Sequence, residues 1–180
     1  TRVFGRDRDD ATDHAVVQYV EARRAKLYRT AYLICGDPHR AEDLVQIALA
    51  KAYVSWSRLE RAGNVDAYVR RILVNAHVDE TRRSWRRERL VLDAVGETVP
   101  ATPDPSFEDS EELWSALRGL PPGQRRVVVL RHYWGLSVDE TAADLGISPG
   151  TVKSQTADAL TRLRAVMSVA DKGADHEAPR

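Results

Sequence analysis

Two residues in this sequence have the spacing of metal ligands: Cys35 and His39, in the stretch CGDPH. A zinc site needs three or four such ligands, and the chain does not supply them, because Cys35 is the only cysteine and the five histidines are scattered. The residues between the pair, Gly36-Asp37-Pro38, are typical of a turn between helices. We therefore expect no metal site and no cofactor.

The polar residues also lack the groupings that catalysis needs. The sequence has no HExxH motif, no glycine-rich phosphate loop and no constellation of His, Ser and Cys side chains. A single cysteine excludes an intrachain disulfide, which suits a reducing cytosol, and no apolar run approaches the roughly 18 residues of a membrane span. No secretory signal opens the chain. The sequence thus predicts a cytoplasmic protein that is not an enzyme and has no membrane partner.

Positive charge is concentrated in one stretch, TRRSWRRER at 81–89, which contains five arginines. The whole chain is nevertheless neutral, with 27 basic and 27 acidic residues, because the segment 93–112 holds seven acidic residues and no Lys or Arg. Such segregation is compatible with a nucleic-acid partner despite zero net charge. On a helix, Arg82, Arg86 and Arg89 would share one face, which forms either a solvated helix end or a surface for phosphates.

Helices must position these side chains, and the first half of the sequence predicts three of them. Apolar residues recur there at helical spacing, in segments separated by turns that contain glycine or proline. The third segment has an apolar stripe that packs on the other two, whereas the polar first twelve residues are expected to fray. The expected helices are residues 15–34, 38–56 and 66–89, with a loop at 60–66.

A change of composition marks a second unit. The segment GETVPATPDPSFEDS has three prolines, several acids and no periodicity, which is typical of a flexible linker. Helical patterns resume at 111–117 and 121–134. The predicted fold is therefore all-α, with two small helical domains at 15–90 and 111–168 joined by a flexible acidic linker at 91–110.

The stretch SVDETAADLGISPGTVKSQTADALTRL carries the signals of a helix-turn-helix. Ser137 and Glu140 form a capping box at the start of one helix, and Gly146 ends that helix. Ser148 and Pro149 start a second helix, whose first turn is polar. A helical hairpin inside an ordinary bundle would leave this polar start unexplained, so we expect DNA binding. The apolar face of the second helix comprises Val152, Thr156, Ala159, Leu160, Leu163 and Met167.

With these motifs in place, the chain resembles a known family. SPGTVKSQTADALTRLR is similar to the domain-4 recognition helix of bacterial extracytoplasmic-function (ECF) sigma factors, and LPPGQRRVVVLRHYWGLSVDETAADLG to the segment before it. AEDLVQIALAKAY resembles the core-binding helix of sigma domain 2, and DAYVRRILVNAHVDETRR its promoter-melting segment. The four matches follow the family's order between Ala15 and Met167.

This resemblance implies a transcription initiation factor that binds core RNA polymerase through its clamp and flap regions and recognises the −10 and −35 elements of promoter DNA. Many relatives also bind an anti-sigma factor. The acidity of the linker then suits a basic channel of the polymerase, although a soluble tether fits the sequence equally. The rival hypothesis is a dimeric helix-turn-helix regulator that never joins polymerase, and it gives the domain-2 motifs no role.

The resemblance also assigns roles to individual residues. Domain 2 would bind the polymerase clamp through Asp43, Leu44 and Gln46. This chain departs from the family at the next position, because many relatives carry glutamate where it has Ile47. Glutamine on a recognition helix can pair bidentately with adenine, and the −35 candidates are Thr151, Lys153, Ser154 and Gln155, with Lys153 meeting phosphate. The −10 candidates, which capture melted bases or hold phosphates, are Arg58, Asn64, Tyr68, Arg70, Arg71, Asn75, Arg82, Arg83 and Arg86.

Three further residues have other expected roles. Trp56 is an aromatic residue at helical spacing, and we expect it in the core rather than stacked on a base. Trp85 is expected to anchor the arginine-rich helix to the core. Asp158 stands where relatives often have arginine, and it would either turn away from phosphates or accept a hydrogen bond from cytosine.

Overall fold

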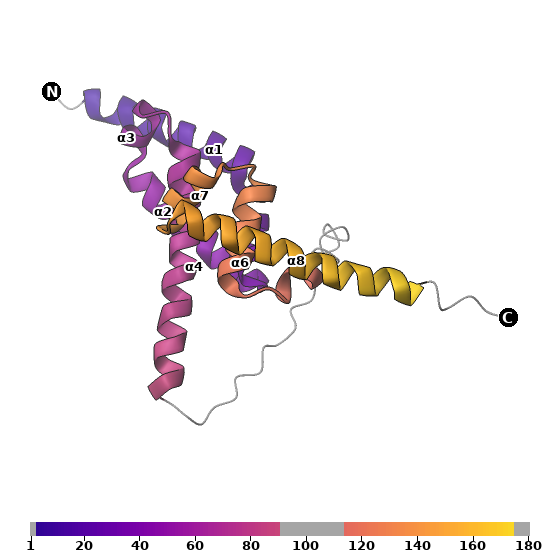
Figure 1. Ribbon diagram of the computed structural model, residues 1–180. Helices are drawn as coiled ribbons and strands as arrows, with labels where there is room; N and C mark the ends of the chain where they lie inside the picture. The colour runs from indigo at the N-terminus through magenta and orange to yellow at the C-terminus, as the bar shows by residue number, and fades with distance from the viewer. Residues whose placement is uncertain (1–2, 91–113, 175–180) are drawn as a thin grey trace. The chain divides into compact units, whose positions relative to one another are not determined.

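The computed structural model of the chain describes residues 3–90 and 114–174, and side chains within 12–83 and 114–166 (Figure 1). All regular elements in these ranges are helices, and none of the helices is both long and apolar enough to cross a membrane. The chain divides into two compact units, Thr1–Val99 and Pro100–Arg180. The predicted all-α fold with two helical domains is confirmed, while the predicted linker at 91–110 lies outside the described residues.

The first unit is built from four helices around one core. They are α1 (Val3–Cys35), α2 (Pro38–Val54), α3 (Trp56–Arg61) and α4 (Val65–Leu90). α2 packs against both α1 and α4, and the short α3 contacts all three. The core side chains come from widely separated segments and include Leu27, Leu33, Ile34, Val45, Ala48, Val69, Leu73 and Val74, each at most 1% exposed.

α1 begins twelve residues before the predicted start at residue 15, so the expectation of a frayed first dozen residues was wrong for the backbone from Val3 onward. The polar composition misled the prediction because these residues have no apolar stripe. Nothing in the segment stops a helix, however, since it has no proline and only one glycine. A helix can therefore run through it without a core to cover.

The turn between α1 and α2 forms as predicted from Gly36-Asp37-Pro38. Gly36 has φ of 75°, a left-handed conformation that glycine adopts without a Cβ clash. The Asp37 side chain accepts a hydrogen bond of 2.8 Å from the backbone N–H of Arg40, and Pro38 occupies the first helical position of α2. α2 thus starts at a fixed place directly after α1.

The second unit consists of a short helix at 114–118, α6 (Pro122–Val128), a π-helical turn η2 (Val129–Tyr133), α7 (Val138–Leu145) and α8 (Pro149–Ala174). α6 and α7 both pack against α8. A core of Val127, Ala142 and Val152 joins these three helices, with partly buried side chains around it: Val138, Leu145 and Ile147.

The π-helical turn is a departure from the predicted continuous helix over 121–134. At its end the N–H of Trp134 donates to the carbonyl of Val129 at 3.2 Å, a hydrogen bond that spans five residues instead of four. The Arg131 guanidinium donates to the carbonyl of Leu136 just beyond the turn. Helical periodicity in sequence does not distinguish a four-residue from a five-residue hydrogen bond, so the π turn was not foreseeable.

The predicted helix-turn-helix signals all form. Ser137 Oγ accepts from the N–H of Glu140 at 3.1 Å, and the Glu140 carboxylate accepts from the N–H of Ser137 at 2.7 Å, which completes the capping box of α7. Gly146 ends α7 with φ of 63°. Ser148 Oγ then caps α8 by accepting from the N–H of Thr151 at 3.1 Å. The angle between the two helices is therefore set by local caps as well as by the core.

We expect the substitution Ser137→Ala to lower the free energy of unfolding by about 1 kcal/mol, because it removes the hydroxyl that accepts the Glu140 N–H, while the backbone N–H of residue 137 can still donate to Glu140. Urea unfolding followed by far-UV circular dichroism measures the loss. Ser115→Ala is the matched control, since Ser115 is exposed on the helix at 114–118. Equal urea midpoints for the two variants would contradict a stabilising role for the box.

Candidate functional site

One face of α4 gathers four of the residues expected to contact the −10 element. At about 100° per residue around a helix, Tyr68, Arg71, Asn75 and Arg82 fall within an arc of about 60°. Arg71, Asn75 and Arg82 are exposed, and Tyr68 is half-buried. This set, called the α4 surface below, combines two cations, an amide and an aromatic ring along one line. Such a surface can hold phosphates and contact unpaired bases.

Of the three other arginines of α4 predicted for the −10 contact, two lie off this surface, and the side chain of the third is not described. Arg70 is only 7% exposed and belongs to the packed side of α4 with Leu73, Val74 and His77. These four residues are spaced i, i+3, i+4 and i+7, so they share one side of the helix, and Arg70 is covered together with its apolar neighbours. Arg83 is exposed but turned about 100° from Arg82, toward α2. Arg86 lies on α4, and its side chain, like that of Trp85, is outside the described part.

The loop before α4 presents two more predicted residues. Asn64 is exposed, and its carbonyl accepts from the N–H of Tyr68 at 3.1 Å, so it stands at the start of the helix. Arg58 is exposed on α3. Gly63, between them in sequence, has φ of 63° and turns the chain from α3 into α4. The loop and the α4 surface are therefore continuous along the chain.

A cluster of partly buried side chains fixes this loop to α1, which the sequence analysis did not foresee. Arg23 Nη2 and Asp66 Oδ2 form an ion pair of 3.0 Å between α1 and the first turn of α4. The Tyr19 and Trp56 rings meet edge to face, with centroids 5.3 Å apart. Burial and the neighbouring Asp66 carboxylate raise the pKa of Tyr19. No local pattern relates these residues, because α1 and α4 are joined only by tertiary packing.

Trp56 is 4% exposed, which confirms its predicted place in the core. It packs on Tyr19 at the base of the loop and leaves Tyr68 as the aromatic residue of the α4 surface that reaches solvent. Of the two aromatic side chains considered for base stacking, Trp56 is therefore buried and Tyr68 is the one that reaches solvent.

The residues expected to contact polymerase lie on α2. Asp43 and Gln46 are exposed, and Ile47 beside them is 42% exposed, an unusual value for an isoleucine in a packed helix. Leu44 differs, because it is only 3% exposed and packs inward. Its side chain can thus support the α2 helix but offers little area to a partner. Asp43, Gln46 and Ile47 form the α2 surface.

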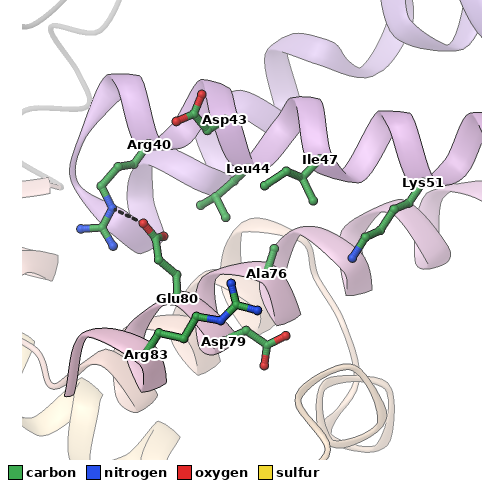
Figure 2. Close-up of a pocket in the computed structure, with 9 residues that line it drawn as sticks. All are labelled: Arg40, Asp43, Leu44, Ile47, Lys51, Ala76, Asp79, Glu80 and Arg83. Carbon is green, nitrogen blue, oxygen red and sulfur yellow. Dashed lines mark hydrogen bonds and ion pairs between the residues drawn. The ribbon is translucent and has the colours of Figure 1, made fainter. Parts of the chain in front are cut away.

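A groove of about 300 Å³ runs between α2 and α4 beside this surface. Figure 2 shows Leu44 and Ile47 from α2 across from Ala76 of α4, with charged side chains at the rim. At one end Arg40 Nε lies 3.1 Å from Glu80 Oε1 and ties the two helices together. The lining residues are Arg40, Asp43, Leu44, Ile47, Lys51, Ala76, Asp79, Glu80 and Arg83.

In the second unit, the start of α8 carries the predicted −35 residues. Thr151, Ser154 and Gln155 fall within an arc of about 100°, whereas Lys153 lies about 160° from Gln155 around the axis. Ser154 and Lys153 are exposed, while Thr151 and Gln155 are half-buried. The Thr151 hydroxyl lies 2.8 Å from Ser148 Oγ and so takes part in the helix cap. Lys153, which the sequence analysis expected to meet phosphate, thus lies apart from Thr151 and Gln155 on the helix.

The pair Cys35 and His39 does not form part of a metal site in the described part of the chain, where no three His, Cys, Asp or Glu residues are grouped for a metal. The Cys35 thiol donates to the carbonyl of Asp37 at 3.3 Å. Burial raises the pKa of this thiol to about 11. The thiol is therefore held neutral at physiological pH, which suits a packing role in the turn.

We expect Cys35 to react with iodoacetamide at pH 8 on the order of 100-fold more slowly in the folded protein than in denaturant, because only the thiolate reacts. The pKa of the Cys35 thiol in the unfolded chain is about 8.5, which is lower than in the folded chain. This difference contributes to the stability of the fold below the unfolded pKa, and the contribution is lost as the pH rises toward 11. Mass spectrometry of alkylated protein over time measures the rate, with Cys35→Ser as the blank. Equal rates in both states would contradict the burial of the thiol.

Comparison with known proteins places both units in one family. Residues 19–87 match the family model for Sigma-70 region 2, and residues 110–163 match that for Sigma-70, region 4. The chain is 43% identical over 151 residues to the RNA polymerase sigma-E factor of Streptomyces coelicolor, covering 82% of each protein. It is 34% identical over 161 residues to the ECF RNA polymerase sigma factor SigE of Mycolicibacterium smegmatis, covering 86% of this chain and 62% of that protein.

A solved structure agrees with the sequence matches. The sigma factor RpoE of Bartonella quintana, crystallised with the anti-sigma factor NepR, is similar with a TM-score of 0.71 and 28% identity. The similarity covers 84% of this chain and 96% of the RpoE chain. The dimeric regulator considered above explains only the second unit, and the region 2 match over 19–87 sets it aside.

Proposed function

Since this chain belongs to the extracytoplasmic-function group of RNA polymerase sigma factors, we propose that the surfaces described above divide the work of initiation between its two units. A sigma factor is a transcription initiation factor and not an enzyme: it binds core RNA polymerase and directs it to promoters by recognising −10 and −35 elements. The proposal concerns which residues of this chain do so. We assign domain 2 to 15–90, the linker to 91–110 and domain 4 to 111–168.

The α4 surface contacts the −10 element. Arg71 and Arg82 hold backbone phosphates, and Tyr68 and Asn75 contact unpaired bases of the melted strand. Asn64 and Arg58 extend the contact onto the loop that precedes α4. The observation that carries this assignment is the alignment of two exposed arginines with an exposed amide on the same face of α4. We leave Arg70 out because it is buried, and we assign Arg83 to the groove side.

The first turns of α8 enter the major groove of the −35 element. Gln155 and Ser154 face base edges, and the glutamine carboxamide is suited to adenine. Thr151 completes the cap that orients the helix and lies on the same side. Lys153, on the flank of α8, holds a phosphate. Phosphate contacts fix the position of the helix, and base contacts select the sequence.

The α2 surface docks on the clamp of core polymerase, and the second unit docks on the flap. Asp43 and Gln46 supply polar contacts, and Ile47 supplies an exposed apolar contact at the place where many relatives have an acidic residue. The NepR partner of the Bartonella quintana relative supports an anti-sigma factor as a third partner for this chain, which would hold it inactive. Because polymerase and promoter DNA are its working partners, we place the protein in the cytoplasm.

In vitro transcription tests the function directly. Purified core polymerase is incubated with a pool of genomic fragments, with and without this protein, and the RNA 5′ ends are sequenced. We expect start sites that depend on the protein and share two upstream motifs at fixed spacing. If the protein yields no start sites and does not co-elute with core polymerase, the proposed assignments lose their basis.

A further inference from the structure

The side chain of Gln155, on α8, lies against residue 123 of a different helix, α6. A Cβ built at Gly123, in the first turn of α6, would lie 3.3 Å from Nε2 and 3.4 Å from Oε1 of Gln155. A side chain at residue 123 would therefore crowd the carboxamide and displace it. Gln155 is half-buried, whereas its neighbours Lys153 and Ser154 are exposed. The contact joins the first turn of α6 to the first turns of α8.

The backbone does not explain why residue 123 is glycine. The glycines with positive φ in the described residues are Gly36, Gly63, Gly135 and Gly146, so Gly123 has an ordinary helical conformation. Glycine is among the least favourable residues within a helix, and alanine would suit the α6 backbone better. The contact with Gln155 supplies a reason, because a Cβ at residue 123 would lie closer to the carboxamide than an ordinary van der Waals contact and would push it out of its present position.

We infer that Gly123 is a specificity-determining position, which acts by seating the Gln155 carboxamide in the orientation that selects a base in the −35 element. This inference rests on the proposed role of Gln155. A glutamine side chain loses considerable rotational freedom when it is fixed, and a side chain that is already ordered loses less of it on binding. Bidentate pairing with adenine also requires the oxygen and nitrogen of the carboxamide at fixed positions. Gly123 is a positioning residue and does not itself touch DNA.

The test compares how strongly the holoenzyme prefers one base over another at each position of the −35 element. A change in folding stability alone would not alter this preference. Holoenzyme is assembled from core polymerase and each variant, and its Kd is measured at one salt concentration for promoters that differ by single bases across the −35 element. The variants are Gly123→Leu, the milder Gly123→Ala, Gln155→Ala and the double variant Gly123→Leu/Gln155→Ala. Gly119→Leu is the matched control, because a Cβ at Gly119 meets only the Ala116 carbonyl at an ordinary 3.7 Å.

We expect Gln155→Ala to lower the preference at one −35 position by about 5- to 150-fold, the range of a bidentate pair. Gly123→Leu will lower the preference at the same position by about 5-fold or more, with a smaller change for Gly123→Ala. In the double variant Gly123→Leu will add nothing, because the side chain through which it acts is gone.

The inference is overturned if Gly123→Leu and Gly123→Ala leave the preference unchanged while Gln155→Ala reduces it. It is also overturned if Gly123→Leu has the same effect with and without Gln155, since it would then act by another route. If Gln155→Ala changes no preference, the base-reading role of Gln155 is wrong and this inference is wrong with it. Should Gly123→Leu fail to co-elute with core polymerase, Gly123→Ala carries the comparison alone.

Discussion

Holoenzyme that carries Arg71→Glu together with Arg82→Glu will bind its promoter on the order of 100-fold more weakly than holoenzyme with the native chain. Each arginine is proposed to make a charged hydrogen bond to phosphate, which contributes about 1.5–3 kcal/mol, and a tenfold change in affinity corresponds to about 1.4 kcal/mol. The two positions share the exposed face of α4, so the variant loses both contacts of that face. Fluorescence anisotropy with a labelled promoter measures the loss.

The salt dependence of binding separates this explanation from a general loss of fold. Each phosphate contact removed lowers the slope of log K against log salt concentration by about 0.7–0.9, so the double variant will show a slope smaller by about 1.5. Arg118→Glu is the control, because Arg118 is exposed in the second unit and has no proposed DNA contact. An unchanged slope, or an equal loss in the control, would show that the α4 surface does not hold phosphates.

Asp43→Arg will weaken binding of the protein to core polymerase at least tenfold and will reduce transcription from every promoter by a similar factor. Asp43 is exposed on α2 at the rim of the groove, so the substitution leaves the core of the first unit in place. At a docked interface, an arginine in place of an acid meets the cation that the acid paired with, and like charges brought together there cost several kcal/mol. Binding to immobilised core polymerase measures the effect.

Two comparisons make this expectation specific. Glu21→Arg reverses an acidic residue that is exposed on α1 and is not one of the residues of the α2 surface, and it should bind core polymerase normally. Gln46→Ala removes a neutral contact and should have a smaller effect than Asp43→Arg. If the Asp43→Arg variant binds core polymerase as tightly as the native chain, the clamp contact does not lie on the α2 surface. The Arg71/Arg82 variant, in contrast, should join core polymerase normally and fail only at DNA.

Together these variants distinguish the two surfaces of the first unit. α4 contributes to both, because Arg82 lies on its exposed surface while Arg83, one residue later, lines the groove on the side opposite Asp43 (Figure 2). We therefore expect a single substitution at Arg83 to act on polymerase binding more than on promoter affinity. The arginine-rich stretch 81–89 thus has more than one role, although the sequence offered it as one basic surface.

The sequence by itself determined where several helices begin and end, although it did not predict the short α3 or the end of α2 at Val54. Asp37 caps α2 through Arg40, Ser137 and Glu140 cap α7 through each other, and Gly146 ends α7. Every one of these bonds is closed by residues within four positions along the chain. Local signals of this kind do not depend on distant packing, so the amino-acid order alone is enough to recognise them. The order of the motifs along the chain likewise identified the family.

Only the tertiary structure decided which side chains remain available. Arg70 and Arg71 are neighbours in sequence, yet α1 and α2 cover one side of α4 and leave Arg70 buried and Arg71 exposed. The same is true of Gln155, whose carboxamide meets Gly123 thirty-two positions earlier in the chain. Exposure and side-chain orientation depend on elements that are distant in sequence, because packing brings them together with a register that no local pattern records.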